Sequence, residues 1–173
     1  MSHPLVLALY ADVASAAEAA RGAHALGIDR ADLSVVARDH EAEGRIANQI
    51  DASPGSEIQD SPAASRMGEL SGYILAAIAI GLPGTGAMVA AGPLAAELSE
   101  VAGHVAGQVT GDLKGTLVKA GMTEAAAEQW RVQIENGRAI LLGVHARRAQ
   151  AADIESVLSK NSIAPVVHTQ WND

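Results

Sequence analysis

The chain has 173 residues, a formal net charge of −8 and no cysteine. This length suits one domain, or one domain with a large insertion, and it allows a real hydrophobic core. The negative charge repels phosphate backbones and anionic lipid, so nucleic acid is not an expected partner. Without cysteine, the chain can form no disulfide, thiolate nucleophile or thiolate metal site, and we expect a cytoplasmic protein.

Two segments of the chain share one pattern. The first has apolar runs at 5–10 and 33–37 around an alanine-rich helix pattern at 13–26, and the apolar run at 5–10 lacks the basic lead-in of an export signal. The second has apolar runs at 140–145 and 165–169 around a helix pattern at 149–158. Short runs rich in Val, Ile and Leu favour strands, so each copy is predicted to be strand, helix, strand. Residues 1–38 and 138–173 therefore predict an α+β, ferredoxin-like sandwich. Its four-stranded antiparallel sheet carries its helices on one face, and the first and last strands are neighbours.

About 100 residues separate the second predicted strand from the third. We interpret 39–66, which is rich in Asp, Glu, Ser and Pro, as a polar crossing segment with a short helix near 41–50. The inserted part, 67–137, is predicted to be a helical hairpin followed by a connecting helix. The hairpin begins in a stretch without charged residues, 70–96, which Pro83-Gly84-Thr85-Gly86 interrupts. The first uninterrupted arm, 70–82, would reach only about 20 Å as a helix, short of the roughly 30 Å core of a bilayer. Membrane contact through 70–96 is therefore the lesser alternative.

The second arm of the predicted hairpin, 93–119, contains a row of glycines at four-residue intervals: Gly103, Gly107, Gly111 and Gly115. Each glycine inside a helix costs about 1 kcal/mol relative to alanine, so we expect another backbone to pack against the row. The first arm offers small residues for this contact at Gly72 and Ala76, which is the favoured interpretation of the row, and direct contact with a second subunit is the alternative. Val101, Val105 and Val109 form another apolar face on the opposite side of the helix. A helix with two apolar faces needs neighbours on both sides. The second neighbour is either the sheet domain or another subunit, and we favour a homo-oligomer, with another protein as a further partner.

After the hairpin, Gly121 is predicted to end a helix and Thr123 to cap the next, which carries Trp130 and Ile134 on one face and ends at Gly137. The segment Leu82-Pro-Gly-Thr-Gly-Ala-Met-Val-Ala-Ala-Gly-Pro-Leu94, the glycine row and Gly121-Met-Thr-Glu-Ala-Ala-Ala-Glu128 together resemble bacterial general stress proteins of the heat-induced stress protein type. That group largely lacks an assigned activity. The resemblance implies a stress-associated cytoplasmic protein and supplies no catalytic residue or cofactor.

The residues themselves indicate no reaction. The chain has no phosphate-binding glycine loop followed by lysine, no nucleophile elbow and no His-Glu-x-x-His, so no catalytic or cofactor-binding residue is assigned and an enzyme is not expected. Three histidines, His3, His145 and His168, are expected toward one end of the sheet, with His145 and His168 on its open face. Imidazoles suit zinc, copper, nickel or iron. Solvated strand ends or a dimer contact are the favoured interpretation of these histidines, so they remain metal candidates only and no metal site is assigned.

Three functions are compatible with these patterns. The preferred hypothesis is a non-enzymatic, self-associating stress-related protein that acts through the helical hairpin and the open sheet face. The first alternative is a small-ligand or metal sensor that uses the strand-end histidines. The second is a peripheral membrane protein anchored by the apolar hairpin.

Overall fold

A computed structural model describes residues 2–38, 78–82, 86–100 and 112–172. These residues form an antiparallel sheet of six strands in the order β3-β4-β2-β5-β1-β6. The strands are β1 (Ser2–Tyr10), β2 (Leu33–Arg38), β3 (Ile78–Leu82), β4 (Gly86–Ala91), β5 (Ile140–His145) and β6 (Val167–Asn172). The helices are α1 (Val13–Ala25), α5 (Pro93–Glu100), α6 (Leu113–Lys119), α7 (Glu124–Glu135) and α8 (Ala151–Leu158), with single 3₁₀ turns η1 (Arg30–Asp32) and η2 (Arg148–Gln150). None of the described helices is long and apolar enough to cross a bilayer.

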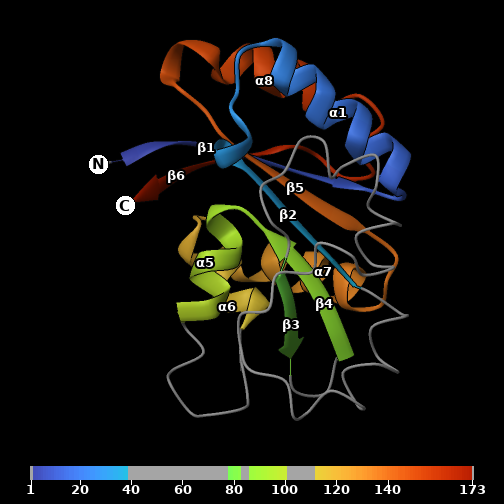
Figure 1. Cartoon of the computed structure of the whole chain (residues 1–173). Helices are drawn as coiled ribbons and strands as arrows, with labels where there is room; N and C mark the ends of the chain where they lie inside the picture. The colour runs from blue at the N-terminus through green and yellow to red at the C-terminus, as the bar shows by residue number, and fades with distance from the viewer. Residues whose placement is uncertain (1, 39–77, 83–85, 101–111, 173) are drawn as a thin grey trace.

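The four strands predicted from the two copies are all present. They lie in the order β6-β1-β5-β2, so the first and last strands of the chain are neighbours, as expected. Leu5 of β1 pairs with His145 of β5 on one side and with Thr169 of β6 on the other. The two ends of the described chain consequently meet at one edge of the sheet, where Ser2 pairs with Asn172 (Figure 1).

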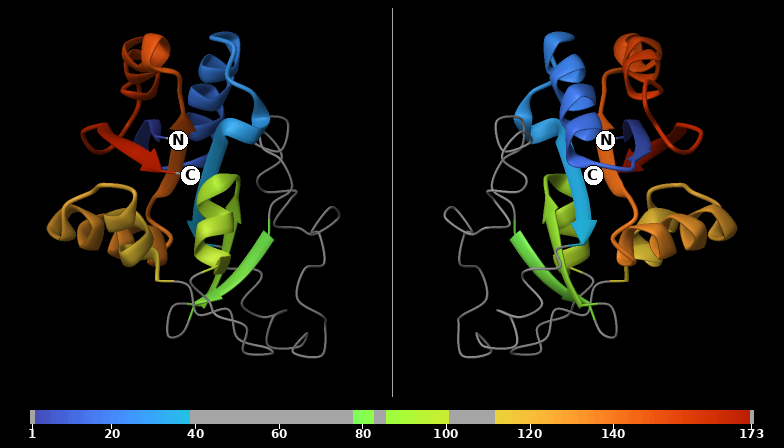
Figure 2. Two further views of the ribbon diagram at one scale, coloured as in Figure 1. Left: turned by 90° about the vertical axis from the view of Figure 1, so that its left-hand side faces the viewer. Right: turned by 90° about the vertical axis from the view of Figure 1, so that its right-hand side faces the viewer.

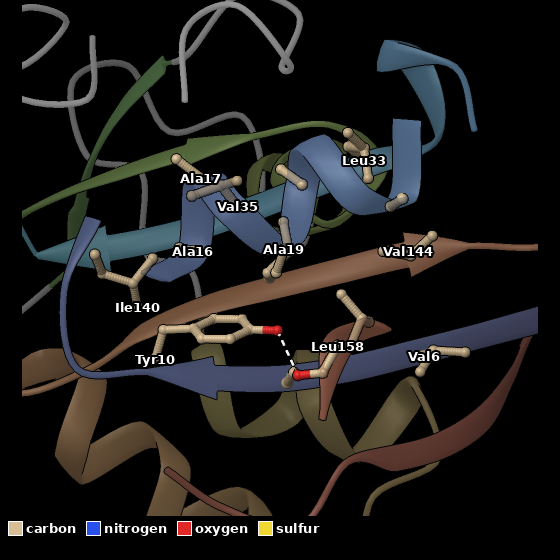
Figure 3. Packing of buried hydrophobic residues seen from close by; sticks show 14 of the residues in the cluster. Val6, Tyr10, Ala16, Ala17, Ala19, Leu33, Val35, Ile140, Val144 and Leu158 are labelled. Carbon is tan, nitrogen blue, oxygen red and sulfur yellow. Dashed lines mark hydrogen bonds between the residues drawn. The ribbon is translucent and has the colours of Figure 1, made fainter. Parts of the chain in front are cut away.

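One face of the sheet packs against α1 and α8. Alternate residues of β1 point to this face, and there Val6, Ala8 and Tyr10 meet the buried alanines of α1 and the buried Ile154 and Leu158 of α8 (Figure 3). Alanine side chains are short, so α1 lies close to the strands. This is the helical layer that the sequence predicts.

The opposite face of the sheet is covered as well, and the expectation of an open face is wrong. Leu5, Leu7 and Leu9 point to this side and pack in a second core with residues of α5, α6 and α7. Figure 1 shows α1 and α8 above the sheet and these three helices below it, and Figure 2 shows the same layers from the sides. The inserted region supplies the second layer because its helices carry apolar residues such as Leu94, Leu117 and Trp130, which need burial.

The first part of the insertion is a β-hairpin where it is described, which corrects the predicted helical arm. Ile78–Leu82 and Gly86–Ala91 are antiparallel strands, with Ile80 opposite Met88, and β4 joins β2 at the edge of the sheet. The predicted chain reversal at Pro83-Gly84-Thr85-Gly86 does fall between the two arms. A short apolar run fits a buried strand as well as a buried helix, and periodicity alone does not separate them.

The second arm is not one continuous helix. Helices α5 and α6 begin and end at the predicted limits, Pro93 and Lys119, but Asp112 has an extended backbone (φ −101°, ψ 99°) and starts α6 anew. Gly115 is exposed, and the nearest neighbours of a Cβ placed there would be side-chain atoms of Asp112, the closest at 2.6 Å. Among the described residues, no other helix lies against Gly115, and the predicted partners of the glycine row are not among them. The other residues of that prediction lie outside the described residues: Gly72, Ala76, Val101, Gly103, Val105, Gly107, Val109 and Gly111.

Helix α7 follows its prediction closely. The backbone turns at Gly121 (φ +101°), and Thr123 caps the helix by accepting a hydrogen bond from the amide of Ala126 at 3.3 Å. Trp130 and Ile134 are buried on one face, and Gly137 (φ +67°) follows the last turn. The cap and the two glycines explain why this helix has sharp ends.

Candidate functional site

Two histidines that are far apart in the sequence meet on the face of the sheet that carries α5, α6 and α7. His3 Nε2 lies 2.8 Å from His145 Nδ1, and the ring centroids are 5.1 Å apart. The strand register causes this contact, because Leu5 pairs with His145 and His3 is two residues earlier on the same face of β1. Trp171 of β6 is the strand partner of His3 of β1. Its indole ring meets the ring of His145 edge-on, with the ring centroids 5.2 Å apart. We call His3, His145, Ser34 and Trp171 the histidine cluster.

Ser34 connects this cluster to α5. Its fully buried hydroxyl oxygen lies 3.4 Å from His145 Nε2 and accepts a hydrogen bond from the backbone amide of Leu94 at 3.1 Å. His145 is itself only 6% exposed. The contact between His3 and His145 needs one nitrogen to donate and the other to accept, so at least one of the two facing nitrogens must lack a proton. The polar groups of the cluster, buried at Ser34 and His145 and half-buried at His3, therefore join β1, β2, β5 and the start of α5.

Two glycines let the chain pack closely around the histidine cluster. Gly92 precedes α5 with φ +79°, and a Cβ there would lie 2.0 Å from the carbonyl oxygen of Leu33. A Cβ on Gly143 in β5 would lie 3.1 Å from methyl groups of Leu7 and Leu94. Gly92 requires glycine both for its backbone conformation and because a side chain would not fit. The close approach of Gly92 to β2 brings the amide of Leu94 within hydrogen-bonding distance of Ser34.

His168 does not join the other two predicted histidines. It pairs with Val6, whose side chain belongs to the core under α1 and α8, and its Nε2 lies 3.0 Å from a carboxylate oxygen of Glu155 on α8. His145 and His168 were expected to share a face, and this expectation is wrong. The alternation of side chains between the two faces is as predicted within each strand. The register between strands, however, places His168 in one row with Val6 and Val144, on the face opposite to that of His145.

His3 and His145 are two potential metal ligands in direct contact. Two nitrogens that bind one tetrahedral zinc ion at about 2.0–2.1 Å are roughly 3.3 Å apart, so the pair would open by about half an ångström to hold a metal. Across 2–38, 78–82, 86–100 and 112–172, no group of three or more His, Asp or Glu side chains is arranged to hold a metal ion. The Ser34 hydroxyl beside His145 is fully buried, so this Ser–His contact faces the protein interior.

A charged cluster on α7 was not singled out in the sequence. Arg131 forms ion pairs with Glu128, at 2.6 Å, and with Glu135, and Arg38 of β2 donates to the carbonyl oxygen of Glu135 at 2.7 Å. The hydrogen bond from Arg131 lowers the pKa of Glu128, whereas burial raises the pKa of Glu135 despite its contact with Arg131. In the sequence, Arg131 follows Glu128 by three residues and precedes Glu135 by four, a spacing that predicts ion pairs on one face of a helix. The cluster joins the end of α7 to β2, and its chemistry is that of a structural ion-pair network.

The outer strands of the sheet form a different kind of candidate site. Within the described residues, β3 pairs only with β4 and β6 pairs only with β1. Neither strand contains Lys, Arg, Asp, Glu or Pro, the residues with which natural edge strands commonly prevent pairing with another chain. Each edge therefore presents a row of backbone donors and acceptors without a charge to repel an added strand.

The direction of the backbone groups in β6 follows from its neighbours. The amide of Ala146 donates to the carbonyl oxygen of Pro4 at 2.9 Å, so the even-numbered residues of β1 bond to β5. The odd-numbered residues consequently bond to the other side, and the amide of Ile163 indeed donates to the carbonyl oxygen of Leu9 at 2.8 Å. In β6, residues 167, 169 and 171 face these odd-numbered partners. The N–H and C=O groups of His168, Gln170 and Asn172 thus point away from the sheet.

Comparison with known proteins gave no match to this chain among family models, curated proteins or solved structures.

Proposed function

We propose that this protein is a non-enzymatic, self-associating protein whose copies join through the edges of the sheet. One observation carries the proposal: in the part of the chain that the structure describes, the sheet ends on both sides in strands, β3 and β6, that lack charged residues and proline. The order β6-β1-β5-β2 supports a ferredoxin-like arrangement with an insertion that adds β3, β4 and a second helical layer. A stress-related role rests on the resemblance to general stress proteins alone.

The composition of the edges is informative because the rest of the chain is strongly acidic. The net charge of −8 makes two copies repel each other, and this repulsion is weakest where the contact surface carries no charge. β3 and β6 are two such surfaces, of five and six residues. Strand addition at an edge draws its affinity from main-chain hydrogen bonds, so it does not require a large apolar patch.

The experiment is a mass measurement by light scattering over a range of protein concentrations. The proposal predicts a mass that is a multiple of 17.7 kDa and that rises with concentration until assembly is complete. Salt should favour assembly, because it screens the repulsion between acidic copies. A mass of one chain at every concentration and salt level would contradict the proposal.

A second candidate function, small-ligand or metal sensing, is favoured by the contact between His3 and His145. Two imidazole nitrogens 2.8 Å apart are close to the separation of two ligands of one metal ion. Metal analysis of the purified protein and of a His145→Ala variant tests it, with His24→Ala as the control because the ring of His24 bonds locally to the carbonyl oxygen of Ile28. Equal metal content in all three proteins would reject the site.

A further inference from the structure

We infer that two copies of this chain pair through β6, antiparallel and about a two-fold axis at Gln170, so that the two sheets become one. This inference rests on the proposed self-association and specifies the edge, the partner and the register. It begins from the outward direction of the backbone groups of His168, Gln170 and Asn172.

These three residues are spaced symmetrically about the middle one. When a second β6 runs antiparallel beside the first with Gln170 opposite its own copy, His168 of each chain faces Asn172 of the other. All three pairs then have their N–H and C=O groups directed at each other, which is the hydrogen-bonded kind of antiparallel pair. No other residue used as the centre engages all three outward-pointing residues of β6 at once.

The second copy is the favoured occupant because of charge. A strand of the sequence Val-His-Thr-Gln-Trp-Asn places no two acidic and no two basic side chains opposite each other when it pairs with itself. On the α8 side, the carboxylate of Glu155 contacts the ring of His168. At the centre, Gln170 is exposed, and its side-chain oxygen accepts a hydrogen bond from the hydroxyl of Ser2 at 3.0 Å.

β6 is also an edge that can add a strand without rearrangement. Its six residues are in regular strand geometry against β1, and Leu5, Leu7 and Val167 hold it from the core side. Free antiparallel edges of this kind accept an added strand in recurring modes of protein recognition. The dimer sheet would then run to twelve strands, with β3 of each copy at its two ends.

Disulfide trapping tests the register directly, because the natural chain has no cysteine. In the proposed dimer the two Cα atoms at position 170 are about 5.5 Å apart, within the range of a disulfide. Those at position 168 are about 14 Å apart, since four residues separate them along the strands, and they cannot be bridged. Mild oxidation of Gln170→Cys should therefore give covalent dimers, while His168→Cys and the α8 surface control Ser156→Cys should remain monomeric on a non-reducing gel.

A proline pair supplies an independent measurement. The amide of Gln170 points outward, so Gln170→Pro should keep the monomer fold by circular dichroism and lose self-association by light scattering. The amide of Thr169 points toward β1, so Thr169→Pro should instead lower the melting temperature. The β6 pairing would be overturned if His168→Cys formed disulfide-linked dimers as fast as Gln170→Cys, or if the Gln170→Pro protein still assembled. Either result would leave self-association itself in place. Wild-type protein that stays monomeric throughout would overturn both.

Discussion

Tyr10 donates its phenolic hydrogen to the carbonyl oxygen of Leu158 at 2.6 Å, which ties the end of the first strand to the last residue of α8 (Figure 3). The carbonyl groups of a final helical turn have no partner within their helix, so this bond satisfies one of them in the interior. Tyr10→Phe should lower the free energy of unfolding by about 1–2 kcal/mol. Urea unfolding monitored by circular dichroism measures the loss.

The same tyrosine predicts a pH dependence. Burial raises the pKa of Tyr10 in the folded protein above its usual value near 10. A group whose pKa is raised on folding contributes stability below its unfolded pKa and loses that contribution as the pH rises toward the folded value. The advantage of the natural protein over Tyr10→Phe should therefore be largest at pH 8 and shrink above about pH 10. An advantage that is constant from pH 8 to pH 11 would contradict this assignment.

Gly92 and Gly27 form a matched pair for substitution. Both have positive φ, +79° and +84°, but a Cβ at Gly92 would lie 2.0 Å from a backbone oxygen, whereas a Cβ at Gly27 would have a side-chain nitrogen of Gln150 as its nearest described neighbour, 4.0 Å away. Gly27→Ala should cost about 1 kcal/mol from backbone strain alone. Gly92→Ala should cost several times as much, because Leu33 must also move. Thermal melting of both variants makes the comparison, and equal losses would show that the close approach at Gly92 is relieved cheaply.

Ser34 is predicted to hold the start of α5. Ser34→Ala removes the acceptor of the Leu94 amide inside a fully buried site, which should cost about 1–3 kcal/mol of stability. Ser156→Ala, on the exposed side of α8, should change stability by less than about 0.5 kcal/mol. Guanidinium unfolding of the two variants separates them. If the variants lose the same amount, the hydrogen bond from Leu94 is not the reason Ser34 matters.

Glu135 is predicted to weaken the fold at neutral pH. Burial raises its pKa above the usual value near 4.3, so the folded state prefers the protonated acid, and the contribution of this group is fully present only below that value. Glu135→Gln mimics the protonated acid and should gain stability relative to the natural protein as the pH rises from 4 to 7. Chemical unfolding at the two pH values tests the sign, and a relative loss at pH 7 would show that the ion pair with Arg131 outweighs burial.

The sequence was sufficient to predict those parts of the fold in which local signals agree. The Leu and Val runs of β1 and β5, the alanines of α1 and the cap at Thr123 all specify their elements without help from distant contacts. The pairing of β1 with β6 followed from the internal repeat. The inserted region was harder, because Ile78–Leu82 is uniformly apolar and only its pairing with β4 makes it a strand.

The histidines show where local reasoning stops. Alternation gave the relative direction of neighbouring side chains within β5 and within β6, but the face of His168 depends on its register with Val6, which no local pattern contains. The contact of His3 with His145 has the same origin. The sequence left open whether the inserted helices pack on the sheet or on another subunit, because local patterns do not show that α5, α6 and α7 fold back onto Leu5, Leu7 and Leu9.

The place of β1 in the sheet has a consequence for synthesis. Both of its neighbours, β5 and β6, come from residues 140–172, so β1 acquires no strand partner among the described residues until almost the whole described chain has been made. During that interval its leucines can pack only against α5, α6 and α7, which precede β5 in the chain, and its main-chain groups have no strand partner among the described residues. The pairing of β1 should therefore be a late event in folding, because contacts between residues far apart in the sequence form slowly.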